Sequence, residues 1–99
     1  MNEDVVAQRK PVALVTGGGT GVGRAIAKAL ALAGYQLVIS GRRTAVLEKA
    51  VAALSAETNG RFLAVTADVS DPGSVKNLFD TIEKTCGRLD LLVNNAGTL

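Results

Sequence analysis

Apolar runs and helically spaced apolar residues alternate along the chain from Pro11 onward. Four short runs are apolar nearly throughout, which is typical of strands buried on both faces of a sheet. They lie at residues 12–16, 36–40, 61–67 and 89–93. Between these runs, apolar residues recur at helical spacing, within residues 24–33, between Thr44 and Asn59, and between Pro72 and Gly87. The pattern therefore predicts the element order β-α-β-α-β-α-β.

This alternation predicts an α/β fold, because strands joined by helices pair in parallel through right-handed crossovers. We expect a Rossmann-type, doubly wound parallel sheet with strand order 3-2-1-4 and helices on both faces. Thr44 and Asp71 are placed to cap the starts of two helices, and Gly34 and Gly87 to close two. Residues 1–10 carry charges of both signs without an apolar run, which predicts a loose tail rather than a signal peptide.

Composition narrows the range of functions. The 99 residues are 47% hydrophobic and carry a net charge of +2, too little to indicate a nucleic-acid partner. No stretch approaches the roughly 20 apolar residues of a membrane span. The absence of histidine excludes histidine catalysis and histidine-dependent zinc sites. A single cysteine, Cys86, cannot form an internal disulfide, which is compatible with a reducing compartment, so we expect a cytoplasmic protein. Cys86 lies on the apolar side of the third predicted helix, and we expect it to be a core residue.

A glycine-rich loop is the first candidate binding site. Five glycines lie between the first strand and the first helix: Gly17, Gly18, Gly19, Gly21 and Gly23. Such a loop lets a ligand approach the backbone closely, and the N–H groups at a helix start attract a phosphate. The alternative is a flexible turn without a ligand.

The spacing of the loop discriminates among phosphate ligands. A P-loop would need lysine followed by serine or threonine where Arg24 and Ala25 stand, so the Mg²⁺-binding hydroxyl is missing. The common G-x-G-x-x-G pattern does not fit at any offset. The pattern that fits is Thr16-Gly17-x-x-x-Gly21-x-Gly23.

Three motifs in order resemble those of the short-chain dehydrogenase/reductase family. They are the loop at residues 16–23, Asp68-Val69 after the third strand, and Asn94-Asn95-Ala96-Gly97 after the fourth. The resemblance covers essentially everything after the tail. It implies a dinucleotide cofactor and an oxidoreductase that interconverts a carbonyl and an alcohol by hydride transfer.

The resemblance also assigns roles to the matched positions. The pyrophosphate would be held by residues that shape the turn (Gly17, Gly21, Gly23) and residues that line it (Gly19, Thr20, Val22). Asp68 and Val69 would hold the adenine, with helix capping as the alternative role for Asp68. The ribose would be bordered by Asn95, Ala96 and Gly97, while Asn94 would brace the central strands.

The end of the second strand indicates which dinucleotide is bound. NAD sites place an acidic residue roughly 20 residues after the glycine loop, to hold the ribose 2′-hydroxyl. Here that position is Gly41, followed directly by Arg42 and Arg43. Guanidinium groups pair well with a 2′-phosphate, so the sequence predicts NADP and makes NAD less favoured. The alternative is two solvated arginines in a turn.

The resemblance implies catalytic residues in a Ser–Tyr–x–x–x–Lys arrangement. The chain offers none of these catalytic residues. The single tyrosine, Tyr35, lies at a helix end with Ile39 four residues on, so we expect it to pack there. We therefore expect residues 11–99 to be the truncated, dinucleotide-binding half of a Rossmann domain. Alone it should be inactive and poorly ordered.

The sequence is compatible with several partners and functions. The full-length protein would act on a small carbonyl or alcohol substrate, without nucleic acid or membrane, and homo-oligomers are compatible with the family. The alternatives are a non-catalytic NADP-binding or sensor module and a truncated gene product. An S-adenosylmethionine methyltransferase also uses a glycine-rich turn, but Arg42 and Arg43 would not serve a ligand without phosphates.

Overall fold

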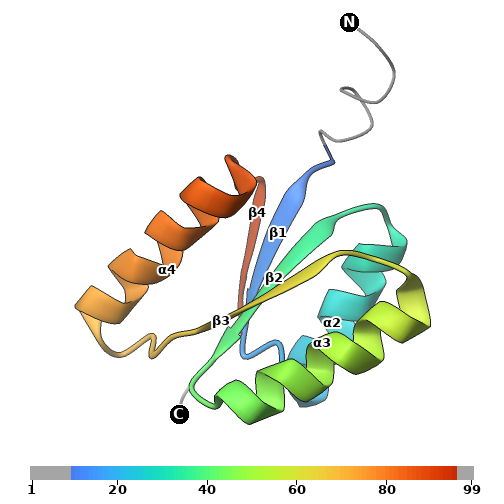
Figure 1. Ribbon diagram of the computed structural model, residues 1–99, viewed down its shortest axis with the longest axis horizontal. Helices are drawn as coiled ribbons and strands as arrows, with labels where there is room; N and C mark the ends of the chain where they lie inside the picture. The colour runs from blue at the N-terminus through green and yellow to red at the C-terminus, as the bar shows by residue number, and fades with distance from the viewer. Residues whose placement is uncertain (1–9, 96–99) are drawn as a thin grey trace, which may run out of the picture.

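A computed structural model describes residues 10–95, in which strands and helices alternate as the sequence predicts (Figure 1). The predicted tail, apart from Lys10, lies outside the described residues, as do Ala96 and Gly97. The strands are β1 (Val12–Thr16), β2 (Gln36–Gly41), β3 (Phe62–Thr66) and β4 (Leu91–Asn94). The helices are α2 (Gly21–Leu32), α3 (Thr44–Thr58) and α4 (Pro72–Cys86).

All four strands pair in parallel, in the order β3-β2-β1-β4, which confirms the predicted order 3-2-1-4. Leu14 of β1 lies opposite Val38 of β2 on one side and opposite Leu92 of β4 on the other. Helices α2 and α3 cover one face of the sheet, and α4 covers the other (Figure 1). The carboxyl ends of the strands therefore meet at one edge, where a doubly wound fold forms its ligand crevice.

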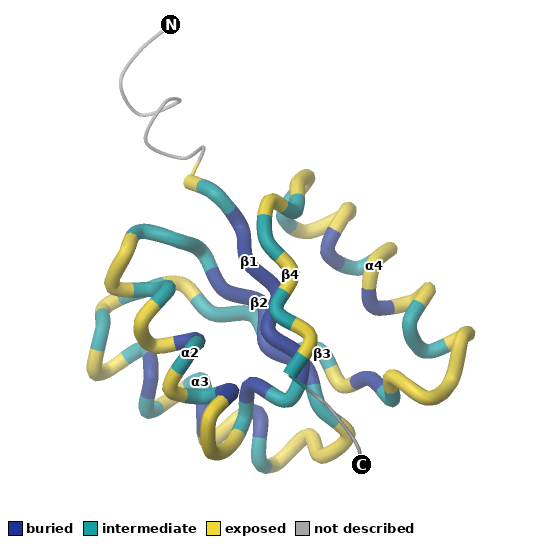
Figure 2. Tube along the Cα trace, turned by 180° about the vertical axis from the view of Figure 1, so that it is seen from behind, coloured by how far each residue is buried: buried dark blue, intermediate teal, exposed yellow. Residues whose placement is uncertain are grey.

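The core consists of two apolar clusters, one on each face of the sheet. Alternate residues of β1 contribute to opposite clusters, with Ala13 and Val15 on the α2–α3 side and Val12 and Leu14 on the α4 side. Every residue of β1 is buried, and Figure 2 shows the centre of the sheet as the most buried part of the chain. This burial on both faces explains why the strand is apolar at consecutive positions.

Two elements, β4 and α2, begin at other residues than the sequence predicts. The fourth strand begins at Leu91 rather than Leu89. Just before it, the Asp90 carboxylate accepts the N–H of Val12 at 2.8 Å and the N–H of Asp90 donates to the Val12 carbonyl oxygen at 2.9 Å. Helix α2 begins at Gly21, three residues earlier than the apolar periodicity indicates. The glycine loop thus supplies its first turn.

The helix ends largely follow the sequence signals. Asp71 caps α4 by accepting the N–H of Gly73 at 3.1 Å, and Gly87 closes the same helix with a left-handed φ of 75°. The prediction that Thr44 caps α3 is wrong, because Arg43 holds the N-cap position. The Thr44 hydroxyl instead forms a hydrogen bond with the Thr66 hydroxyl at 2.8 Å. None of the helices within residues 10–95 is long and apolar enough to cross a membrane.

Candidate functional site

A cleft of about 400 Å³ opens at the carboxyl ends of β1, β2 and β3. It is bounded by the three chain segments that follow these strands. Seven of the predicted site residues line it: Gly17, Gly19, Thr20, Arg42, Arg43, Asp68 and Val69. Residues of the glycine loop, the arginine pair and the Asp68-Val69 motif are therefore brought to a single cavity.

The glycine loop lies flat against the end of β2. Gly17 adopts a left-handed φ of 67°, which turns the chain out of β1. The N–H groups of Gly17 and Gly18 then donate to the carbonyl oxygen of Ser40, at 2.8 and 3.3 Å. A Cβ on Gly18 would lie 2.7 Å from Cγ2 of Ile39, so the close approach to β2 requires glycine there.

The first turn of α2 is open to an anion. Thr20 precedes the helix in an extended conformation, its side chain makes no capping hydrogen bond, and the first turn carries no acidic residue. Gly21 and Val22 of this turn are exposed and lie outside the cleft lining, and Gly23 is buried beneath the loop. The unpaired N–H groups and the positive end of the helix dipole therefore have no side-chain counterpart.

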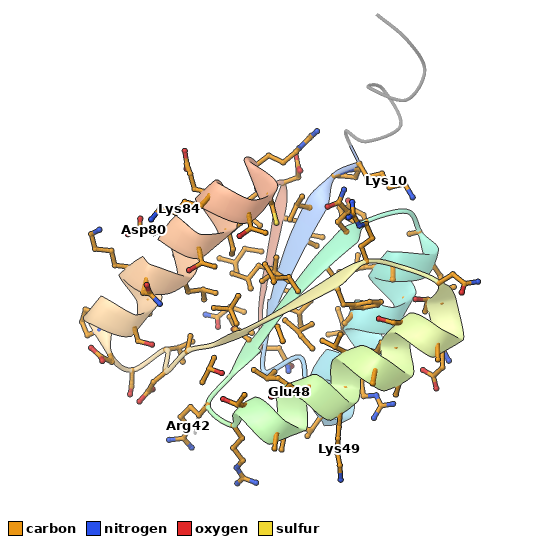
Figure 3. The ribbon with its side chains drawn as sticks, viewed as in Figure 1. Lys10, Arg42, Glu48, Lys49, Asp80 and Lys84 are labelled. Carbon is orange, nitrogen blue, oxygen red and sulfur yellow. The ribbon has the colours of Figure 1, made fainter. Side chains whose placement is uncertain are left out.

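Arg42 and Arg43 follow β2 and are both exposed at the cleft. Figure 3 shows Arg42 projecting outward from the turn between β2 and α3. At Gly41 a Cβ would make ordinary contact with Cδ2 of Leu47, at 3.5 Å, so a side chain at this position is sterically allowed. Lack of space therefore does not explain the absence of an acidic residue at position 41.

Asp68 forms the opposite side of the cleft as a fixed, ionised carboxylate. Its Oδ1 accepts both the hydroxyl of Ser70, at 2.6 Å, and the N–H of Ser70, at 2.9 Å. These bonds lower the pKa of Asp68, and the positive charge of Arg42 lowers this pKa further. The cap of α4 is Asp71, while the N–H of Asp68 donates to Ser74 Oγ at 2.8 Å. Exposed Val69 lies next to this carboxylate.

Asn94 and Asn95 tie β4 to the start of the glycine loop. The Thr16 hydroxyl donates to Oδ1 of Asn94 at 3.1 Å and accepts the N–H of Asn95 at 2.9 Å. The side-chain amide of Asn95 donates to the carbonyl oxygen of Gly17 at 3.4 Å. Asn94 thus braces the central strands as expected, and Asn95 braces the loop without lining the cleft.

Several cleft residues were not predicted from the sequence. They are Ser40, Gly41, Val46, Leu47, Ala67 and Ser70. Leu47 lies among the helically spaced apolar residues between Thr44 and Asn59, and it is both buried and part of the cleft lining. The spacing Asp68-x-Ser70 was a usable signal, because a serine two residues after aspartate often closes a side-chain turn.

The described part of the chain offers neither a metal cluster nor a catalytic tyrosine. No group of three or more histidine, cysteine or carboxylate residues lies close enough to hold a metal within residues 10–95. Tyr35 packs against the core cluster on the α2–α3 side, just before β2. Tyr35 therefore lies at the amino end of β2, whereas the cleft lies at the carboxyl ends of the strands. Its predicted packing role is confirmed.

Known proteins resemble this chain over most of its length. An oxidoreductase of Caenorhabditis elegans is 46% identical over 86 residues, which are 86% of this chain and 28% of that protein. The 3-oxoacyl-(acyl-carrier-protein) reductase of Bos taurus is 44% identical over 86 residues, which are 87% of this chain and 35% of that protein. The chain thus spans about a third of the length of these relatives.

A solved structure and the sequence pattern of a family also match this chain. The crystal structure of L-sorbose reductase from Gluconobacter frateurii, complexed with NADPH and L-sorbose, superposes with a TM-score of 0.86 at 36% identity. The match covers 90% of this chain and 34% of that one. The sequence pattern of the family described as short chain dehydrogenase matches residues 11–99. The chain therefore belongs to the short-chain dehydrogenase family.

Proposed function

We propose that this chain binds NADP(H) in the cleft and forms the cofactor site of an oxidoreductase that interconverts a carbonyl and an alcohol. The bound dinucleotide would supply or accept the hydride. The observation that carries the proposal is the pairing of Arg42, at the cleft, with a glycine at position 41, where NAD sites place an acid.

The pyrophosphate would lie at the start of α2. Its charge matches the uncapped first turn, where the helix dipole and free N–H groups favour an anion. Gly17, Gly21 and Gly23 would shape this turn, and Gly19, Thr20 and Val22 would line it. The carbonyl of Ser40, which anchors the loop, would keep these donors in place.

The 2′-phosphate would lie at Arg42, with Arg43 beside it. A charge-assisted hydrogen bond contributes about 1.5–3 kcal/mol, which corresponds to a roughly ten- to hundredfold preference for NADP(H) over NAD(H).

The adenosine would lie between the ends of β2 and β3. Oδ2 of Asp68 carries no donor from residues 10–95, so it is free to accept the adenine amino group. Val69 would offer an apolar surface to the base, being 41% exposed. Asn95, Ala96 and Gly97 would border the ribose, with Asn95 positioned by its bond to the Gly17 carbonyl.

The relatives support this assignment in general terms. L-sorbose reductase is described in complex with NADPH, and the bovine relative is described as a reductase. Since these 99 residues hold one tyrosine, placed far from the cleft, we expect them to bind the cofactor without turning over a substrate. Residues 11–99 would then be the dinucleotide-binding half of a larger Rossmann domain.

The test is a comparison of NADPH and NADH affinity by calorimetry with the intact protein. Arg42→Ala should weaken NADPH binding about ten- to hundredfold and leave NADH binding unchanged. Arg61→Ala is the matched control, because this exposed arginine precedes β3 at the opposite edge of the sheet. NADH binding as tight as NADPH binding in the unaltered protein would remove the 2′-phosphate role of Arg42.

A further inference from the structure

Ser40 is the buried polar residue that the proposed site leaves unexplained. Its side chain is 1% exposed, and its hydroxyl oxygen has no hydrogen-bond partner among residues 10–95. Ser40 also lines the cleft at the carboxyl end of β2. A buried hydroxyl without a partner is uncommon, because it has lost its water and gained nothing in exchange.

The backbone explains where Ser40 lies but not why it is serine. Its carbonyl oxygen accepts the N–H groups of Gly17 and Gly18, and any residue type would supply that carbonyl. Other hydroxyls around the cleft have partners: the Thr44 and Thr66 hydroxyls bond each other, and the Ser70 hydroxyl bonds Asp68. The hydroxyl of Thr20 at the cleft makes no capping hydrogen bond either, but Thr20 is exposed, so Ser40 differs in being buried without a partner.

The alternation of side chains along β2 places the Ser40 side chain on the α4 side of the cleft. Side chains alternate along a strand, and Val38, two residues earlier, belongs to the cluster on the α4 side. Ala67, which follows β3 and lines the same cleft, belongs to this cluster too. Ser40 thus lies with Ala67 on the α4 side of the cleft, between the segments carrying Arg42 and Asp68.

We infer that the Ser40 hydroxyl is a binding group for the adenine base of the dinucleotide, directly or through one bound water. This inference rests on the proposed function. A hydroxyl both donates and accepts, as do the ring nitrogens and amino group of adenine taken together. The phosphates have their own cationic or dipolar sites at Arg42 and at the start of α2. Of the other uncharged hydroxyls that line the cleft, Thr20 lies at the start of α2 and Ser70 already bonds Asp68, which leaves Ser40 for the base.

This role predicts effects of opposite sign on binding and on stability. Ser40→Ala removes the unpaired hydroxyl, so the melting temperature of the ligand-free protein should stay the same or rise. The same change should weaken both NADPH and NADH about three- to tenfold, the range expected for one hydrogen bond. The ratio of the two affinities should not change, since the adenine is common to both dinucleotides.

The experiment measures dissociation constants for NADPH and NADH, and melting temperatures without ligand, on the intact protein. Ser40→Ala is compared with Arg42→Ala, which should affect NADPH alone, and with Ser55→Ala on α3, a serine outside the cleft lining. Ser40→Cys, which replaces the hydroxyl by a bulkier and only weakly donating thiol, should weaken binding at least as much as Ser40→Ala does.

Two results would overturn the inference, and a third would overturn its basis. Unchanged affinities with a lowered melting temperature would make Ser40 a structural residue. A loss confined to NADPH would place the hydroxyl at the 2′-phosphate instead of the base. If the unaltered protein bound neither dinucleotide, the proposed function itself would fail, and the adenine role of Ser40 would fail with it.

Discussion

Single glycines of the loop are required for different physical reasons. Gly17 turns the chain through a left-handed conformation, whereas Gly18 is packed against Ile39 without room for a side chain. At Gly23 a Cβ would overlap the carbonyl oxygen of Gly17 and would lie 2.5 Å from Nδ2 of Asn95. The third glycine of the motif therefore lets the first turn of α2 close against the loop.

Replacing Gly23 should damage stability and binding together. Gly23→Ala forces the loop away from α2, and overpacking of this kind costs about 1–3 kcal/mol of unfolding free energy. Since the loop would hold the pyrophosphate, NADPH affinity should fall as well. Urea unfolding and calorimetry on the intact protein measure both effects.

Gly73→Ala is the matched control for this prediction. Gly73 also lies in the first turn of a helix, but a Cβ there would meet only Oδ1 of Asp71, at an ordinary 3.5 Å. We expect its unfolding free energy to stay within about 0.5 kcal/mol of the unaltered protein. Equal stability of the two alanine variants would contradict the packing role of Gly23.

Sequence motifs identified residues with distinctive chemistry and missed those with ordinary chemistry. Asp68 was predicted because Asp68-Val69 resembles a motif of the family, and Arg42 because it follows the position where NAD sites place an acid; both line the cleft. Leu47 and Ser40 were not predicted, because a leucine on a helical stripe and a serine in a strand fit a core equally well. Only the three-dimensional arrangement shows that both face a cavity.

At the scale of elements, Asp90 links β4 to the central strand. Its Oδ2 accepts the N–H of Val12 at 2.8 Å, and Arg88 donates to both of its oxygens at 2.8 Å. The N–H of Asp90 also donates to the carbonyl oxygen of Val12 at 2.9 Å, so both the side chain and the backbone of Asp90 join β4 to β1 just before Leu91, where the strand begins. The bonds from Arg88 and Val12 lower the pKa of Asp90.

The lowered pKa makes the β1–β4 link dependent on pH. A carboxyl group whose pKa is lower in the folded protein stabilises it above the unfolded value of about 3.9, and this stabilisation is lost as pH falls through the folded value. Asp90→Asn should therefore be less stable than the unaltered protein at pH 7, with the difference shrinking below about pH 4. Urea midpoints of the intact protein across this range measure the effect.

Asp80→Asn serves as the control for Asp90. Asp80 pairs with Lys76 on the exposed surface of α4, at 2.9 Å, and such surface pairs contribute little. Its urea midpoint should match that of the unaltered protein at both ends of the pH range. A pH-independent loss in Asp90→Asn would mean that the carboxylate charge is not what links the strands.

At the scale of the whole molecule, the sheet is most deeply buried at its central strands, and its edge strand β4 is partly exposed. Leu91 and Val93 pack toward α2 and α3, so alternation places Leu92 on the opposite face, where it is 49% exposed. Phe79 of α4 is also 39% exposed. An exposed apolar edge strand is a site of association with other chains unless something covers it.

We therefore expect a polypeptide of residues 1–99, expressed by itself, to self-associate and to bind hydrophobic dyes through the β4 edge. Leu92→Lys should reduce both effects, because a charge on an edge strand opposes strand pairing. Leu32→Lys is the matched control, since Leu32 is 64% exposed at the end of α2, away from β4. Sedimentation and dye fluorescence distinguish the two variants. A sharp cooperative melt of the unaltered monomer, or equal relief by both lysines, would show that the β4 edge is not the uncovered surface.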